Sequence, residues 1–395
     1  MTTQTARTMT RGRTVTFAVA AGMAVGSLYL AQPLIEVIAD SLAVPATTAA
    51  VLVTVTQVGY ALGIFLLVPL GDVLNRRRLI PTVLGLSAVG LVGAALAPTF
   101  SVLLAALAAL GLTTVSAQLL TPLASELAAD DQRGKVVGTV ASGALIGILL
   151  SRTVSGVVAE LWGWRAIFAG AAAVIIALAF VLRAIIPELD ARERVPYLRL
   201  LGSVFTTVTR YRAVGPTLLI SAAVFAVFSM FWTALTYLLT AEPFGFSVAQ
   251  IGLVGIAGLA GALAARRVGA LSDRGWSVPA SGAALALLLV SLVAAWASHT
   301  SILALLVVIV VFDVAAQGNL VLAQTRLLSL PGNARSRLNT AIVVSNFLGG
   351  ALGSALAGRL WAVGGWDAVV LASCTLTLFA LLVWAVSRRR LASTH

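Results

Sequence analysis

Long apolar segments separated by short polar ones recur along the whole chain. An α-helix needs about 20 mostly apolar residues to cross a bilayer, and each segment is close to that length. The apolar runs are continuous, whereas a membrane strand alternates apolar and polar residues. The pattern therefore predicts an all-α membrane protein with twelve transmembrane helices. They are expected at about 15–39, 47–70, 79–97, 101–124, 136–160, 165–186, 213–240, 248–270, 277–298, 301–325, 337–361 and 366–386.

The composition supports this class and excludes others. Of the 395 residues, 60% are hydrophobic and 10% are charged, whereas a soluble domain has about 25% charged residues. The net charge of +12 would suit a nucleic-acid-binding protein, but the arginines form short clusters between apolar runs rather than one basic face. Cys374 is the one cysteine, and His299 and His395 are far apart in the sequence. We therefore expect no disulfide, no metal site, no cofactor and no nucleic-acid partner.

The basic residues predict the orientation of the chain. If the N-terminus is cytoplasmic, all of the 26 Lys and Arg residues except Arg152, Arg165 and Arg359 fall in cytoplasmic segments. Positive residues favour the cytoplasmic side of a membrane. We therefore expect a multi-pass protein of the bacterial inner (plasma) membrane with both termini in the cytoplasm.

Two halves with a polar connection make up the expected domain organisation. The longest polar stretch follows the sixth apolar segment, and its basic amphipathic part from Tyr197 to Arg210 is expected to lie on the anionic cytoplasmic leaflet. The expected units are a cytoplasmic arm at 1–13, a six-helix half at 14–187, a linker with an amphipathic helix at 188–212, a second six-helix half at 213–387 and a cytoplasmic tail at 388–395.

An internal repeat relates the two halves. Asp72 and Asp273 each end an apolar segment, Arg133 and Arg335 each begin one, and the residues of each pair are about 202 positions apart. Gly163-Trp164-Arg165-Ala166 and Gly365-Trp366-Asp367-Ala368 have the same spacing. Six helices between equivalent points give both repeats the same membrane orientation, which predicts two parallel six-helix repeats around a central axis.

Three short motifs carry a family resemblance. Gly59-Tyr60-Ala61-Leu62-Gly63, Val68-Pro69-Leu70-Gly71-Asp72 and Asn75-Arg76-Arg77-Arg78 together resemble the loop signature of major facilitator superfamily transporters. The resemblance extends from about Thr14 to Ser387. Tyr29-Leu30-Ala31-Gln32-Pro33-Leu34 and Arg335-Ser336-Arg337-Leu338-Asn339-Thr340 are similar to the bacterial arabinose-efflux-like or drug-efflux permease branch. The resemblance implies the major facilitator fold and alternating access.

The sequence also departs from the family's motifs. Val68 replaces the usual first glycine of the loop signature, and Asn75 replaces the glycine before the basic residues. Leu107 stands where many proton-coupled drug antiporters have an arginine. The segment Gly143 to Ile148 lacks the proline of the antiporter signature. Efflux and uptake therefore both remain open.

Charged residues inside the apolar segments are candidates for proton coupling. Asp313 lies in the middle of a predicted helix, where a carboxylate costs about 3 kcal/mol on insertion scales and usually serves a transport pathway or an ion pair. Arg152 lies in the outer half of the fifth segment, and Glu36 near the outer end of the first. Arg152 is expected to pair with Glu36 or with Asp313. We predict Asp313 to be the proton carrier, with Glu36 and Arg152 as its coupling partners.

The resemblance also implies a cytoplasmic latch. In the family, an aspartate at the end of the second helix meets the start of a helix in the other half and closes the cytoplasmic side. Here Asp72 would face 333–337 and Asp273 would face 131–135. The predicted latch residues are Asp72, Arg76, Arg77, Arg133, Asp273, Arg274 and Arg335. The alternative is that both aspartates are solvated loop residues.

Polar and aromatic residues of the apolar segments are expected to line a central cavity, if the family fold holds. These candidates are Tyr29, Gln32, Gln57, Gln118, Trp232, Tyr237, Gln317, Asn319 and Asn346. Each could instead form an interhelical hydrogen bond, worth about 0.6 kcal/mol on average. As a set they suggest a cavity for an amphiphilic ligand.

The expected function is secondary active transport rather than catalysis. The sequence contains no H-E-x-x-H, G-x-S-x-G or P-loop motif. We predict proton-coupled efflux of a small amphiphilic or sugar-like compound by a chain that works as a monomer. A proton-coupled uptake symporter and a transport-dead membrane receptor are the alternatives. The expected partners are the substrate, protons and the lipid bilayer.

Overall fold

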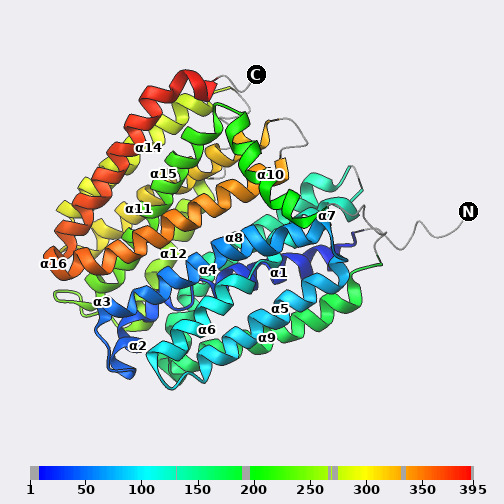
Figure 1. Cartoon of the computed structure of the whole chain (residues 1–395). Helices are drawn as coiled ribbons and strands as arrows, with labels where there is room; N and C mark the ends of the chain where they lie inside the picture. The colour runs from blue at the N-terminus through cyan, green and yellow to red at the C-terminus, as the bar shows by residue number, and fades with distance from the viewer. Residues whose placement is uncertain are drawn as a thin grey trace, which may run out of the picture.

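The computed structural model describes residues 9–129, 131–188, 196–265, 268, 275–330 and 335–392. These residues form helices joined by short turns, with no strand among them, and they fold into two groups of helices (Figure 1). The prediction of an all-α membrane fold is confirmed.

The first half contains six membrane-crossing segments, some of which are built from more than one helix. The segment Arg11–Ser41 is interrupted at η1, where Pro33 stands in the first turn, and the segment Ala46–Asp72 ends in η2 with Pro69 in its first turn. Proline lacks the N–H that continues a helix, so it favours such breaks. The elements are α1 (Arg11–Ser27), η1 (Gln32–Leu34), α2 (Ile35–Ser41), α3 (Ala46–Ala49), α4 (Val51–Leu67), η2 (Val68–Asp72), α5 (Arg76–Ala95), α6 (Phe100–Thr113), α7 (Ser116–Leu127), α8 (Arg133–Trp162) and α9 (Trp164–Ile185).

The second half follows the linker helix α10. Its last helix, α16, changes direction at Gly365, whose φ of 57° and ψ of −144° favour glycine, so that α16 contains two membrane helices. The elements are α10 (Tyr197–Arg210), α11 (Val214–Thr240), α12 (Val248–Ala265), α14 (Ser277–Ala297), α15 (Ile302–Leu328) and α16 (Arg335–Ala392). In the described ranges, ten helical segments are long and apolar enough to span a membrane, and the apolar stretch Val248–Gly258 of α12 is shorter. With α16 counted as two, these correspond to the twelve predicted helices.

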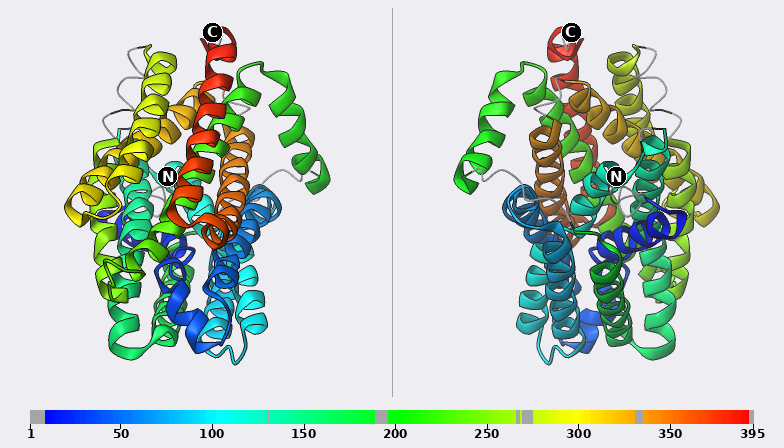
Figure 2. Two further views of the ribbon diagram at one scale, coloured as in Figure 1. Left: turned by 90° about the vertical axis from the view of Figure 1, so that its left-hand side faces the viewer. Right: turned by 90° about the vertical axis from the view of Figure 1, so that its right-hand side faces the viewer.

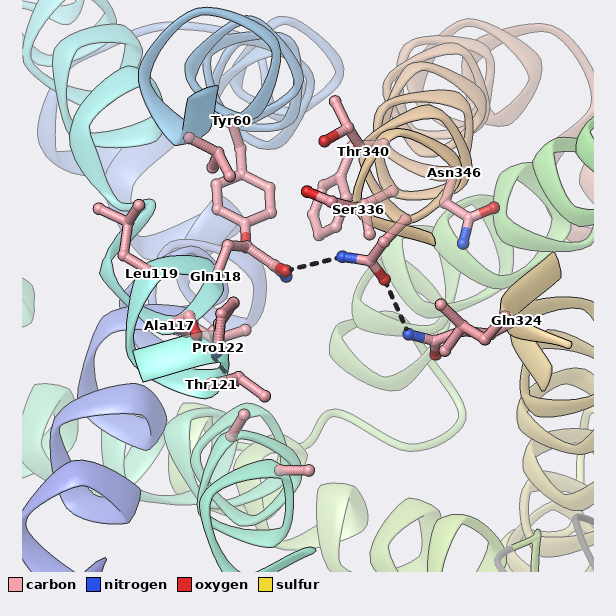
Figure 3. A pocket seen from close by; sticks show the side chains of 18 of the residues that line it. Tyr60, Ala117, Gln118, Leu119, Thr121, Pro122, Gln324, Ser336, Thr340 and Asn346 are labelled. Atoms are coloured by element: carbon pink, nitrogen blue, oxygen red, sulfur yellow. Dashed lines mark hydrogen bonds between the residues drawn. The ribbon is translucent and has the colours of Figure 1, made fainter. Parts of the chain in front are cut away.

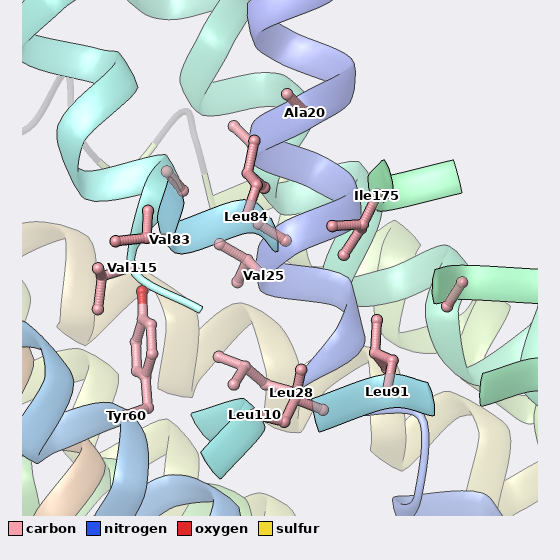
Figure 4. Close-up of a cluster of buried hydrophobic side chains, with 14 of the residues drawn as sticks. Ala20, Val25, Leu28, Tyr60, Val83, Leu84, Leu91, Leu110, Val115 and Ile175 are labelled. Carbon is pink, nitrogen blue, oxygen red and sulfur yellow. The ribbon is translucent and has the colours of Figure 1, made fainter. Parts of the chain in front are cut away.

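Most of each large apolar core lies in one half, although the core of the first half also includes Phe225 and Phe347 of the second. In the first half, side chains from four helices meet, including Leu28, Leu91, Leu110 and Ile175 (Figure 4). In the second half, Phe231 and Phe312 stack with their centroids 4.1 Å apart.

The two ends of the chain lie on the same side of the molecule. The start of α1 and the end of α16 lie there together with α10, whereas α2, α3 and the bend of α16 lie at the opposite end (Figure 1). We call these the terminal side and the far side. Figure 2 shows the same arrangement from two further directions, with α10 standing out from the body of the protein.

Candidate functional site

A cavity of about 1010 Å³ lies between the two halves and extends to the terminal side. Its deep wall carries the aromatic rings of Tyr29, Tyr60 and Phe228. Gln118 of the first half lies opposite residues of α16 in the second (Figure 3). The charged residues among the described part of the wall are at helix ends on the terminal side; they are Asp72, Arg76, Glu126, Arg335 and Arg337.

Direct contacts between the halves close the far side. Gln57 Nε2 donates to Ser229 Oγ over 2.9 Å, and the hydroxyls of Thr54 and Ser354 lie 2.8 Å apart. The Tyr237 hydroxyl donates to the carbonyl of Ala46 over 3.1 Å. Among the described residues, these contacts close the far side, whereas the cavity extends to the terminal side.

One carboxylate strengthens this closure from the surface. Glu160, near the end of α8, accepts hydrogen bonds from Ser247 Oγ (2.7 Å) and from the backbone N–H of Ala249 (2.9 Å) at the start of α12. A carboxylate at a helix N-terminus is favoured by the unpaired N–H groups and the helix dipole. Beneath it, α8 and α12 pack so closely that a Cβ on Gly156 would collide with the carbonyl of Val248. Glu160 thus joins the first half to the second.

A buried charged cluster lies behind the deep end of the cavity. Arg152 of α8 and Asp313 of α15 are 3% and 1% exposed. The guanidinium carbon of Arg152 lies 4.1 Å from the centroid of the Trp232 ring, and Trp232 Nε1 donates to Asp313 Oδ1 over 3.2 Å. Trp232, in the second half, therefore contacts the cation Arg152 of the first half and the anion Asp313 of the second.

Neither charge is fully satisfied in this conformation. Among the described residues, Nη1 and Nη2 of Arg152 and Oδ2 of Asp313 have no hydrogen-bond partner. The two groups still attract each other electrostatically. Buried charges without partners are costly, so they are retained mainly where they serve a function.

Arg152 forms its hydrogen bond with Gln32, and not with Glu36 or Asp313, the partners expected from the sequence. Its Nε donates to Gln32 Oε1 over 3.1 Å, and no ion pair joins it to Glu36 or Asp313 within the described ranges. Gln32 is buried in the turn η1 directly beside α8, whereas Glu36 lies about one turn further along and is only partly buried. Glu36 as a coupling partner stays a prediction.

The helix α12 is fitted tightly over this cluster. A Cβ added to Gly258 would lie 2.5 Å from Asp313 Oδ2 and 2.8 Å from Trp232 Cζ2. Both distances are too short for any real side chain. Gly258 therefore fixes the separation between α12 and the carboxylate.

The predicted latch residues lie around the mouth of the cavity. Arg76 donates to Asp72 (3.3 Å), to Glu126 (2.9 Å) and to the carbonyl of Gly71 (2.9 Å), all in the first half. Arg335 lies on the wall contributed by the second half. Arg77 pairs with Glu188, which is not part of the cavity wall, at 2.7 Å. Arg133 donates to the carbonyl of Ser125, a residue of the wall, over 3.2 Å. Asp273 and Arg274 fall outside the described residues, so the latch stays a prediction.

Four of the nine cavity candidates line the cavity; they are Tyr29, Gln118, Gln317 and Asn346. The other five lie elsewhere, because their helix faces turn toward neighbouring helices. Gln57 and Tyr237 make contacts that close the far side. Asn319 donates to the carbonyl and hydroxyl of Ser281 over 3.1 Å. Gln32 and Trp232 border Arg152 in a separate narrow pocket.

Several residues of the cavity wall were not predicted from the sequence. Tyr60, Phe225, Phe228, Gln324 and Asn339 all line it. A polar side chain in an apolar helix was the available signal for Gln324 and Asn339. The phenylalanines gave no such signal, because aromatic residues are equally common in the cores of helical bundles.

Two parallel groups of membrane helices around a cavity that opens on one side define a membrane transporter. The chain belongs to the Major Facilitator Superfamily, whose family model matches residues 17–330. This confirms the resemblance to the superfamily, whereas the resemblance to the arabinose-efflux-like or drug-efflux permease branch stays a prediction. The chain is a multi-pass membrane protein that carries a small molecule.

Two relatives support this assignment. The uncharacterized transporter YgaY of Escherichia coli O157:H7 is 43% identical over 370 residues, which cover 94% of each chain. SCO4007 of Streptomyces coelicolor, named a probable transporter, is 33% identical and covers 87% of this chain and 80% of its own. The crystal structure of a bacterial homolog of the human lysosomal transporter Spinster, inward-facing and occupied, has a TM-score of 0.74 and covers 95% of this chain and 96% of its own. At 14% identity it shows the shared fold alone.

Proposed function

We propose that the protein exports a small amphiphilic compound in exchange for protons, by rocking of its two halves. The observation that carries this proposal is the buried carboxylate of Asp313, connected through Trp232 to Arg152 of the other half. A membrane-embedded carboxylate is a natural proton acceptor. The mixed aromatic and amide wall of the cavity supports an amphiphilic cargo.

Protonation of Asp313 would change the attraction between the halves. Ionised Asp313 attracts Arg152 and so stabilises the closed far side. A proton on Asp313 removes this attraction and leaves Arg152 only its contact with the Trp232 ring in this cluster of the second half. Asp313 therefore takes up a proton from the far side while that side is open, and loses it when the far side closes and Arg152 approaches again. The proton then moves inward as the cargo moves outward, which is the coupling that exchange by alternating access requires.

The terminal side is the cytoplasm in this proposal. The concentration of Lys and Arg in segments on that side supports this orientation by the positive-inside rule. The linker helix α10 supports it too, because Leu198 is 79% exposed and Phe205 is 64% exposed on a basic amphipathic helix. Such a helix suits the surface of an anionic inner leaflet.

The mouth residues would close the cavity in the opposite conformation. Asp72 and Arg335 stand on opposite walls of the open mouth. When the halves rock, Asp72 would meet the start of α16 and gain from its N-terminal amides. The cavity, the coupling cluster and the latch all belong to one chain, which supports a functional monomer.

Transport in proteoliposomes tests this function. The lumen is made acidic, and uptake of the uncharged probe para-nitrophenyl glucoside is followed with and without a proton ionophore. Accumulation of the probe toward the acidic lumen, abolished by the ionophore, is the expected result. Movement away from the acidic side would contradict efflux and favour a symporter. Binding without any transport would favour a receptor.

A further inference from the structure

Three amide side chains form a hydrogen-bonded bridge across the cavity (Figure 3). Gln324 Nε2 of α15 donates to Asn339 Oδ1 of α16 over 3.2 Å, and Asn339 Nδ2 donates to Gln118 Oε1 of α7 over 3.4 Å. Gln118 belongs to the first half and the other two residues to the second. We call this set the amide bridge.

The amide bridge contains the one direct hydrogen bond between wall residues of opposite halves that the described part of the structure shows, from Asn339 to Gln118. The longer of its two bonds, at 3.4 Å, is the one that crosses between the halves. A neutral hydrogen bond of this length is weak, so a ligand can replace it at little cost. A ligand that contacts both halves could therefore replace the Asn339–Gln118 bond.

The wall beyond the amide bridge carries no formal charge among its described residues. Deeper than the bridge, it presents the rings of Tyr29 and Phe228 and the amides of Gln317 and Asn346. Arg152 and Asp313 are not part of this wall. A charged ligand would be desolvated there without a counter-ion, and that cost is large.

The amide bridge favours a ligand whose hydrogen-bond donors and acceptors match those of the three amide side chains. Each amide side chain offers one carbonyl acceptor and two N–H donors. A ligand with hydroxyl or amide groups on neighbouring atoms can satisfy several amides at once. The aromatic rings beside them suit an apolar face on the same ligand.

We infer that the amide bridge is the substrate-recognition site, and that the substrate is an uncharged molecule with neighbouring hydrogen-bonding groups on an apolar body. This inference rests on the proposed function, because it assumes that the cavity carries the cargo. The substrate takes the place of the Asn339–Gln118 bond and joins the two halves in its stead. Binding thereby favours closure of the mouth around it.

Calorimetric binding to the detergent-solubilised protein, without a proton gradient, tests the inference. The probes share one body and differ in charge: para-nitrophenyl glucoside is uncharged, the glucuronide is an anion and the glucosaminide is a cation. The glucoside should bind at least about tenfold more tightly than either charged relative, because the charge of either relative would be desolvated beside this wall without a counter-ion. A charged probe that binds as tightly as the glucoside, or a glucoside that does not bind, overturns the inference.

Variants locate the site. Asn339→Ala should weaken glucoside binding about tenfold or more, since it removes the centre of the bridge. Gln132→Ala removes an exposed amide that makes no capping bond and should leave binding unchanged. If Asn339→Ala does not fold, Gln118→Ala takes its place. Unchanged binding in the folded variant overturns the inference, whereas selective binding without gradient-driven transport counts against the proposed function alone.

Discussion

The guanidinium of Arg152 stacks on the indole of Trp232 with 4.1 Å between the guanidinium carbon and the ring centroid. This contact joins a helix of the first half to a helix of the second at the closed end of the cavity. A cation–π contact of this kind contributes about 0.5–2 kcal/mol, more when it is desolvated. A change that moves the Trp232 ring should therefore weaken the closure of the far side.

Replacement of Trp232 separates its two roles. Trp232→Phe keeps an aromatic face for Arg152 but removes the N–H that donates to Asp313. Trp232→Ala removes both. We expect Trp232→Ala to populate the state open on the far side more than Trp232→Phe does, as measured by distances between spin labels on α4 and α16. Equal distances in the two variants would show that the stacking contact does not stabilise closure.

Removal of the carboxylate of Glu160 should also loosen the far side. Glu160→Gln keeps the size of the side chain but replaces the anion that accepts from Ser247 and Ala249. We expect a larger fraction of molecules with the far side open, detected as faster labelling of a cysteine placed at Val53, which is buried in the closed form beside Tyr237. Glu188→Gln, on the terminal side, is the matched control and should leave the labelling rate unchanged.

The glycine over the coupling cluster should not tolerate a methyl group. Gly258→Ala would place a Cβ 2.5 Å from Asp313 Oδ2, so Asp313 or α12 must shift. Overpacking of this kind costs about 1–3 kcal/mol. Gly255→Ala on the same helix meets its nearest neighbour at 3.4 Å and is the control. A melting temperature that falls equally in both variants would contradict the close fit at Gly258.

The bend in α16 gives a prediction about stability alone. Gly365→Ala would force a side chain into a backbone conformation with φ of 57° and ψ of −144°, at a cost of about 1–3 kcal/mol. Gly134→Ala, at a helical position where a Cβ meets no atom within 4 Å, should be neutral or stabilise by up to about 1 kcal/mol. Thermal unfolding of both variants in the same detergent measures the difference, and an equal stability would show that the bend relaxes.

Hydrophobic periodicity predicted the fold but not the faces of the helices. The apolar runs and the repeat indicated twelve helices in two halves, because bilayer thickness fixes the length of a span. They could not show that Gln57 points to Ser229, or that Asn319 points to Ser281. Those orientations depend on how each helix is rotated against its neighbours, and an almost uniformly apolar helix does not reveal its rotation.

The coupling cluster was predictable only in part. Asp313 and Arg152 were identifiable because a charge in an apolar segment is costly. Trp232 was expected to line the cavity, yet it contacts both charges from behind the cavity wall. Gln32, in the turn at Pro33, takes the place beside Arg152 that was expected for Glu36, and the sequence did not predict where the first helix is interrupted.

The most direct test of the account is a comparison of two transport modes in Asp313→Asn and the wild type. Exchange of labelled for unlabelled para-nitrophenyl glucoside across the membrane needs substrate binding and rocking but no net proton movement. Accumulation of the same probe driven by an acidic lumen needs proton coupling as well. The account predicts that Asp313→Asn retains exchange and loses gradient-driven accumulation. Accumulation in Asp313→Asn at the wild-type level would contradict it.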